Sequence, residues 1–165
     1  MHCDILVVMT GATPPAPRPV LVSACLLGRA CRFDGRHNHD QVLENELARR
    51  GEVAVPFCPE EHGGLGTPRP AAWLEKSGAA AVLDGRERVL TEGGADVTPG
   101  FLRGAHGALE ACRAHGIESA YLKERSPSCG VHNTHAGGAL VAGPGVTAEH
   151  LRRHGIAVHG VEGRR

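Results

Sequence analysis

The sequence is poor in aromatic residues, has no excess of either charge and contains no long apolar run. Its 165 residues include three Phe, one Trp and one Tyr, so a core must be built mainly from Val, Leu, Ala and Ile. Lys and Arg number 18, and so do Asp and Glu, which gives no electrostatic reason to expect nucleic acid or an anionic membrane as a partner. No run approaches the roughly 20 apolar residues that a membrane-spanning helix needs. The length of the chain is sufficient for one ordinary domain.

The N-terminal segment also lacks the apolar core and cleavage site of a secretory signal. Four prolines fall between residues 14 and 19, so we expect residues 1–19 to form a poorly ordered, Pro-rich lead-in. One domain is then expected over residues 20–165, in a cytoplasmic protein. In that compartment six cysteines indicate metal binding or catalysis, and disulfides stay the alternative for a chain exported by an unusual route.

Apolar runs separated by helical patterns predict an α/β fold. Buried strands are expected at residues 20–24 and 53–57, and two further strands at residues 119–123 and 156–159. Helices are expected at residues 41–50, at residues 98–116 with Thr98 as N-cap, and from an N-cap at Thr147. Residues 79–83 and 88–91, on either side of Asp84-Gly85, predict a hairpin. Strands that alternate with helices predict a single three-layer domain with a mostly parallel sheet.

Three cysteines follow predicted strands. Cys25 comes just after the first strand, Cys58 just after the second, and Cys129 lies in the loop after the third. In a parallel sheet the carboxyl ends of the strands share one edge, and ligands bind outside that edge. We therefore expect these three side chains to converge there, although they are far apart in the sequence.

Spacing alone does not identify the metal that such a site would hold. None of the cysteines forms a Cys-x-x-Cys pair, so the zinc-ribbon, thioredoxin and bacterial ferredoxin signatures do not apply. The cysteines stand instead in longer segments: Ser23-Ala24-Cys25-Leu26-Leu27-Gly28 with Cys31-Arg32-Phe33-Asp34-Gly35, Cys58-Pro59-Glu60-Glu61-His62-Gly63-Gly64 with Thr67-Pro68-Arg69, and Lys123-Glu124-Arg125-Ser126-Pro127-Ser128-Cys129-Gly130.

These segments resemble the hallmark motifs of the thiouracil desulfidase family, from about Val20 to the C-terminus, and the family's helix start is present as Asp96-Val97-Thr98. The resemblance implies a [4Fe–4S] cluster held by Cys25, Cys58 and Cys129, with one iron that has no protein ligand. It implies an enzyme that removes sulfur from a small thiolated substrate such as thiouracil, without net electron transfer, and releases sulfide. A soft, open iron suits this reaction because it polarises a C=S bond as a Lewis acid.

The resemblance also implies two catalytic residues. Attack by water needs a proton acceptor, and the departing group needs a proton donor. The implied residues are Glu60, two positions after Cys58, and a serine of the Ser-Pro-Ser-Cys loop. We favour Ser126 over Ser128, although the spacing does not separate them.

The other cysteines leave alternatives open. Cys31 is either a fourth ligand, which would make the cluster structural or electron-carrying, or a nearby thiol. The resemblance implies that family members differ at this position, so we place Cys31 outside the ligand set. Cys112 lies on the apolar side of its helix and is interpreted as a core residue. Cys3 lies in the lead-in and is interpreted as incidental.

Eleven histidines keep a second class of function open, a Cys/His zinc-binding module with a structural or interaction role. We interpret the histidines near the cysteine segments as solvated loop residues, namely His37, His39, His62, His132 and His135. The sequence predicts no oligomeric state.

The remaining polar residues of the cysteine segments have simpler interpretations. We expect Glu61 to be solvated and Ser23 to satisfy backbone groups at a strand end. We expect an ion-pair network to brace the cysteine loops, made by Arg32, Asp34 and Arg69, and a contact between Arg69 and the substrate is the alternative.

Overall fold

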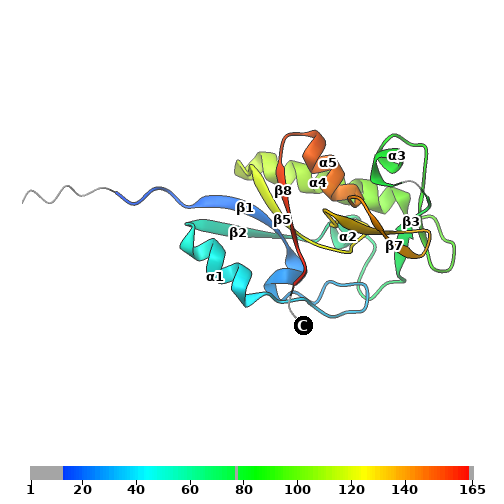
Figure 1. Ribbon diagram of the computed structural model, residues 1–165, viewed down its shortest axis with the longest axis horizontal. Coiled ribbons are helices and arrows are strands. Elements are labelled where there is room, and N and C mark those ends of the chain that lie inside the picture. The colour runs from blue at the N-terminus through cyan, green and yellow to red at the C-terminus, as the bar shows by residue number, and fades with distance from the viewer. Residues whose placement is uncertain (1–12, 77, 164–165) are drawn as a thin grey trace, which may run out of the picture.

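The computed structural model describes residues 13–76 and 78–163, and it contains two four-stranded sheets (Figure 1). The first sheet has the order β2-β1-β5-β8 with every neighbouring pair parallel, and its strands are β1 (Arg18–Ser23), β2 (Glu52–Phe57), β5 (Ser119–Lys123) and β8 (Ala157–Val161). The second has the order β4-β3-β6-β7, from β3 (Ala72–Leu74), β4 (Val89–Thr91), β6 (Asn133–Ala136) and β7 (Ala139–Ala142). The helices are η1 (Ala24–Leu27), α1 (Gln41–Arg49), α2 (Pro59–His62), α3 (Ala79–Leu83), α4 (Thr98–His115) and α5 (Val146–Arg153).

The first sheet has a hydrophobic core on each face. Leu21 of β1 packs with apolar residues of α4 and α5. Val20 and Val22 pack on the opposite face with Leu43 and Leu47 of α1. The strand is buried on both sides because its alternate side chains point to opposite faces of the sheet. The predicted three-layer α/β domain with a mostly parallel sheet is confirmed.

The four strands predicted for the first sheet are all present, but the prediction that residues 53–57 are buried is wrong. β2 lies at the edge of the sheet, and Val53 is 51% exposed. β5 has the predicted bounds, whereas β1 ends at Ser23 because Ala24 begins the short helix η1. The helix predicted at residues 41–50 is α1, and Asp40 caps it by accepting the backbone N–H of Leu43 at 3.0 Å. The predicted end of α4 is also confirmed, since Gly116 adopts a positive φ of 64° there.

Part of the N-terminal prediction falls on residues 1–12, which lie outside the described residues, as does Cys3. β1 begins at Arg18, two residues before the expected domain start, so the proposed division of the chain at residue 20 stays a prediction. Within the described ranges, no helix has the length and apolar character needed to cross a membrane.

The second sheet replaces the predicted hairpin. Residues 88–91 contribute β4, but residues 79–83 form the helix α3, so the hairpin prediction is wrong. The run Ala-Ala-Ala-Val-Leu favours a helix because Ala has the highest helix propensity. Gly85 follows the end of α3 with a positive φ, and its N–H donates to the carbonyl group of Val82 at 3.1 Å. β4 pairs with β3 instead.

Two predicted N-caps are wrong because the threonine hydroxyl groups have other partners. Thr98 is the first residue of α4, and Asp96 accepts its backbone N–H at 2.9 Å. The hydroxyl group of Thr98 accepts the N–H of Val89 in β4. Thr147 is the second residue of α5, and its hydroxyl group bonds to that of Ser128 at 3.0 Å. Both hydroxyl groups therefore connect the start of a helix to another segment.

Glycines on α4 allow α2 to lie directly against it. A Cβ atom at Gly104 would overlap the carbonyl group of Pro59, and one at Gly107 would overlap the His62 ring. Pro59 and His62 are the first and last residues of α2, so the whole of this short helix is in contact with α4. Because α2 begins directly after Cys58, this contact fixes the position of that cysteine.

Replacing Gly104 with Ala is expected to lower the free energy of unfolding by about 1–3 kcal/mol, although Ala favours helices more than Gly does. The added methyl group meets backbone atoms of Pro59, which cannot rotate away, so α2 must shift. Urea denaturation measures the loss. Glu110→Ala on the exposed side of α4 is the control, with a change within about 0.5 kcal/mol. Equal stability of Gly104→Ala and the parent protein would contradict the close packing.

Candidate cysteine site

Cys25, Cys58 and Cys129 line one cavity of about 700 Å³. Cys25 lies in η1 directly after β1, and Cys58 is the residue between β2 and α2. Cys129 lies in the loop after β5 and is buried. The predicted convergence is confirmed, because the three parallel strands end on the same side and the cavity lies at that edge.

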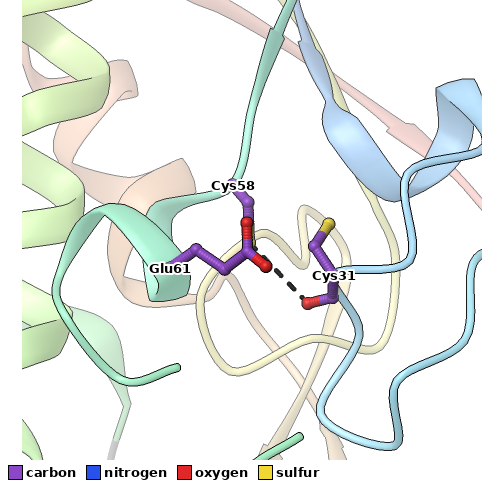
Figure 2. A group of neighbouring side chains, drawn as sticks. All are labelled: Cys31, Cys58 and Glu61. Carbon is purple, nitrogen blue, oxygen red and sulfur yellow. Dashed lines mark hydrogen bonds between the residues drawn. The ribbon is translucent and has the colours of Figure 1, made fainter. Parts of the chain in front are cut away.

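A fourth cysteine, Cys31, lines the same cavity. Donor atoms of Cys31, Cys58 and Glu61 lie within 4.8 Å of one another, and Figure 2 shows the three side chains together. The Cys58 thiol also donates to the carbonyl oxygen of Cys31 at 3.8 Å. A group this compact suits a single ion. Thiolates on different irons of a cluster lie farther apart, since each binds its own iron.

Burial and mutual contact favour the neutral form of these thiols. The hydrogen bond with Cys25 raises the pKa of Cys31 to about 11. The hydrogen bond with Cys31, together with burial, raises the pKa of Cys58 well above its usual range, and burial raises that of Cys129 to about 12. A soft cation deprotonates the thiols that coordinate it. Thiols gathered in one cavity, most of them buried, are therefore a donor set that fits an iron–sulfur cluster.

Arg69 connects two of the cysteine segments. Its Nε donates to Oε2 of Glu60 at 2.6 Å, and its Nη2 donates to the carbonyl oxygen of Cys31 at 3.0 Å. Arg32 forms a separate ion pair with Asp34 at 3.0 Å within the loop after η1. The predicted network of Arg32, Asp34 and Arg69 is therefore wrong as a single network, because Arg69 pairs with Glu60. Arg69 does brace two cysteine segments, and because it also lines the cavity, its alternative role as a substrate contact stays a prediction. Glu60 itself lines the cavity.

Glu61 is not the solvated residue that the sequence predicted. Its Oε1 accepts the hydroxyl group of Thr67 at 2.8 Å, and its Oε2 lies 2.8 Å from Nη2 of Arg29. The helical turn of α2 directs this carboxylate toward Cys31, so Glu61 joins the loop after η1 to the start of α2.

The two serines of the Ser-Pro-Ser-Cys loop have different surroundings. Ser126 lines the cavity, and its Oγ accepts the backbone N–H groups of Ser128 at 3.2 Å and of Cys129 at 3.0 Å. A hydroxyl oxygen that accepts two N–H groups keeps its own hydrogen as a donor. Ser128 is buried against Thr147 and does not line the cavity. The geometry therefore favours Ser126 as the serine available to a ligand.

Two charged residues to which the sequence assigned no role complete this edge of the sheet. Lys123 lines the cavity at the end of β5, and burial lowers its pKa. Its backbone N–H donates to the hydroxyl group of Ser23 at 3.0 Å, which confirms the predicted role of Ser23. The buried carboxylate of Glu124 accepts backbone N–H groups of residues 131–133 and contacts Nδ1 of His132 at 2.6 Å. In the sequence, the adjacent pair Lys123-Glu124 at the end of a buried strand could have indicated that both residues lie at this site.

The histidines do not form a metal site in the described part of the chain, where the one compact group of three possible ligands contains none. His37 is exposed as predicted, and His39 lies 3.2 Å from a carboxylate oxygen of Glu44. His135 differs from the prediction because it is half-buried and lines the cavity. Cys112 is buried in the core beneath the first sheet, as predicted.

Comparison with known proteins shows which family the chain belongs to. A family model described as 2-thiouracil desulfurase matches residues 20–162. The chain belongs to the 2-thiouracil desulfurase family. A solved structure described as the [4Fe-4S]-dependent thiouracil desulfidase TudS is 44% identical, with a TM-score of 0.73 over 87% of this chain and 90% of that chain. The uncharacterized protein YbbK of Bacillus subtilis (strain 168) is 35% identical over 142 residues, which cover 84% of this chain and 93% of that protein. The family resemblance seen in the sequence is confirmed.

Proposed function

We propose that this protein is a [4Fe–4S]-dependent desulfidase that removes sulfur from a thiolated nucleobase such as thiouracil and releases it as sulfide. The observation that carries the proposal is the meeting of Cys25, Cys58 and Cys129 in one cavity of a 2-thiouracil desulfurase family member. The similarity to a desulfidase described as [4Fe-4S]-dependent supports the cofactor and the substrate class.

In this proposal Cys25, Cys58 and Cys129 hold the cluster and Cys31 does not. When bound, the cluster supplies a Lewis-acidic iron that draws electron density from the thione sulfur of the substrate. Three cysteine ligands would leave one iron open to the substrate, as an open position also distinguishes catalytic from structural zinc sites. The surrounding segments hold these cysteines in place through Arg69 and through the contact between α2 and α4.

Glu60 is proposed to bind the attacking water and accept its proton. The ion pair with Arg69 fixes the carboxylate at the cavity wall, two residues after Cys58. A base held in this way needs no reorganisation before the reaction, which is the advantage of preorganised polar groups.

Ser126 is proposed to donate a hydrogen bond to the polar atom of the substrate on which negative charge develops. Its oxygen is fixed by two backbone N–H groups, so its own hydrogen is directed elsewhere. The overall reaction exchanges a thione and water for a carbonyl group and hydrogen sulfide, and no electrons are gained or lost. The proton taken from water leaves with the sulfide.

The setting proposed for this activity is the cytoplasm. Cys25, Cys31, Cys58, Cys112 and Cys129 are all free thiols. Free thiols persist in reducing compartments. The proposal includes a small-molecule substrate and neither a nucleic acid nor a membrane as partner.

Anaerobic purification and reconstitution test the proposal. The expected product is a brown protein with about four irons and four inorganic sulfides per chain that releases sulfide from 2-thiouracil and forms uracil. A colourless protein that carries one zinc would contradict it, and would instead support a structural zinc module at the compact group of Cys31, Cys58 and Glu61. A brown protein that releases no sulfide from thiolated pyrimidines would indicate an electron carrier.

A further inference from the structure

The second sheet builds part of the cavity wall. β3 and β6 are parallel neighbours, with Leu74 opposite Ala136, and both of these side chains are buried in the core next to α3 and α4. Successive side chains of a strand point to opposite faces. Trp73 and His135, each one residue earlier in its strand, therefore point away from that core, and both line the cavity.

Trp73 is the one tryptophan in the sequence, in a chain with only four other aromatic residues of the Phe and Tyr types. It is half-buried at the cavity wall and takes no part in the hydrophobic cores described for residues 13–76 and 78–163. Gly138, in the turn between β6 and β7, adopts a φ of +79°, and a Cβ atom there would lie 3.9 Å from Cζ2 of Trp73. Glycine is favoured at this φ, so residue 138 places no side chain against the edge of the indole.

We propose that Trp73 and His135 form the face of the cavity that recognises the base. The indole of Trp73 stacks on the heterocycle, and the imidazole of His135 forms a hydrogen bond with a polar atom at the edge of that ring. This inference rests on the proposed function and deepens it: the second sheet selects planar heterocyclic thiones over open-chain thioamides and thioureas.

The positions of the two side chains suit this role. Neighbouring strands lie about 4.8 Å apart, so a ring stacked on Trp73 brings its edge within reach of the imidazole on β6. The neutral imidazole offers one donor and one acceptor, and a pyrimidine edge carries both N–H and C=O groups. An aromatic side chain can stack on any flat base, so Trp73 would hold the ring without recognising its sulfur atom. Recognition of the sulfur would then depend on the cysteines at the edge of the first sheet.

The test uses the reconstituted enzyme with its cluster. Equilibrium dialysis with labelled uracil measures the Kd of the product, and sulfide release from 2-thiouracil measures kcat and KM. Trp73→Ala is expected to raise both Kd and KM at least tenfold with kcat within about threefold, because stacking contributes equally to ground and transition states. Trp73→Phe is expected to stay within about threefold of the parent, and His135→Ala to raise KM about tenfold. Val141→Ala, exposed on β7 of the same sheet, is the control.

Unchanged Kd and KM in Trp73→Ala would overturn the inference. So would loss of bound iron from Trp73→Ala, because Trp73 would then support the cysteine loops rather than the base. Trp73→Leu, which keeps apolar bulk without a ring, covers a failure of Trp73→Ala to fold, and a parental Kd in this variant would also overturn the inference. A failure of the proposed function would be seen in the parent protein, which would then bind no cluster or release no sulfide. In that case the Kd of uracil, measured by dialysis, would still test the role of Trp73.

Discussion

Cys58→Ala is expected to lose both the brown colour and all measurable sulfide release. Cys58 stands between β2 and α2, where the close packing of α2 against the glycines of α4 leaves it little freedom. Iron and sulfide analysis after anaerobic reconstitution measures the expected loss, with Cys25→Ala and Cys129→Ala expected to behave in the same way.

Cys112→Ala is the matched control for this experiment. Cys112 is buried in the core of the first sheet, so its replacement is expected to cost about 1 kcal/mol of stability and to leave iron content and sulfide release intact. A decisive comparison uses Cys31→Ala. If Cys31→Ala lost the cluster while Cys58→Ala kept it, the ligand assignment would be wrong.

Glu60→Gln is expected to keep the cluster and lower kcat by about 10²- to 10⁴-fold, the range usual for loss of a general base. Glutamine preserves the size of the side chain and can still accept a hydrogen bond from Arg69, but it cannot take a proton from water. Visible absorbance and iron content measure the cluster, and sulfide release measures turnover.

Glu60→Ala separates two roles of the same carboxylate. Arg69 is almost fully buried, and alanine would leave its charge without the carboxylate that now pairs with it. We therefore expect Glu60→Ala to be less stable than Glu60→Gln, with similar loss of turnover. Glu110→Gln, on the exposed side of α4, is the control and is expected to behave as the parent. Turnover by Glu60→Gln within threefold of the parent would remove Glu60 from the mechanism.

The first sheet and its cysteine edge could be predicted from the sequence because each depends on a local pattern. Apolar runs mark β1 and β5, which are buried, and β2, which is an edge strand, and a polar or cysteine segment follows each of them. Parallel pairing then brings Cys25, Cys58 and Cys129 together without further information. The same reasoning does not position Glu61, whose carboxylate is directed by the turn of α2.

The second sheet could not be predicted because its strands are only three or four residues long. β3 pairs with β6 across about sixty residues of sequence, in a register that has no local signature. The predicted hairpin is wrong because one of its two strands falls on residues 79–83, which form the helix α3. Trp73 and His135 line the cavity only because this sheet forms, so the sequence indicated the chemistry of sulfur but no pocket for the base.

The role of Cys31 also depends on tertiary structure. Its spacing from Cys25 leaves a ligand and a bystander equally possible, and the structure brings it within 4.8 Å of donor atoms of Cys58 and Glu61. This proximity makes the number of cysteine ligands the central question, because the free coordination position on one iron is what the proposed catalysis requires.

Mössbauer spectroscopy of the protein reconstituted with ⁵⁷Fe tests that requirement most directly. We expect one of the four irons to differ from the other three, its signal to change when 2-thiouracil is added, and Cys31→Ala to give the same spectrum. Four equivalent thiolate-bound irons that do not respond to 2-thiouracil, with a distinct iron appearing only in Cys31→Ala, would contradict it.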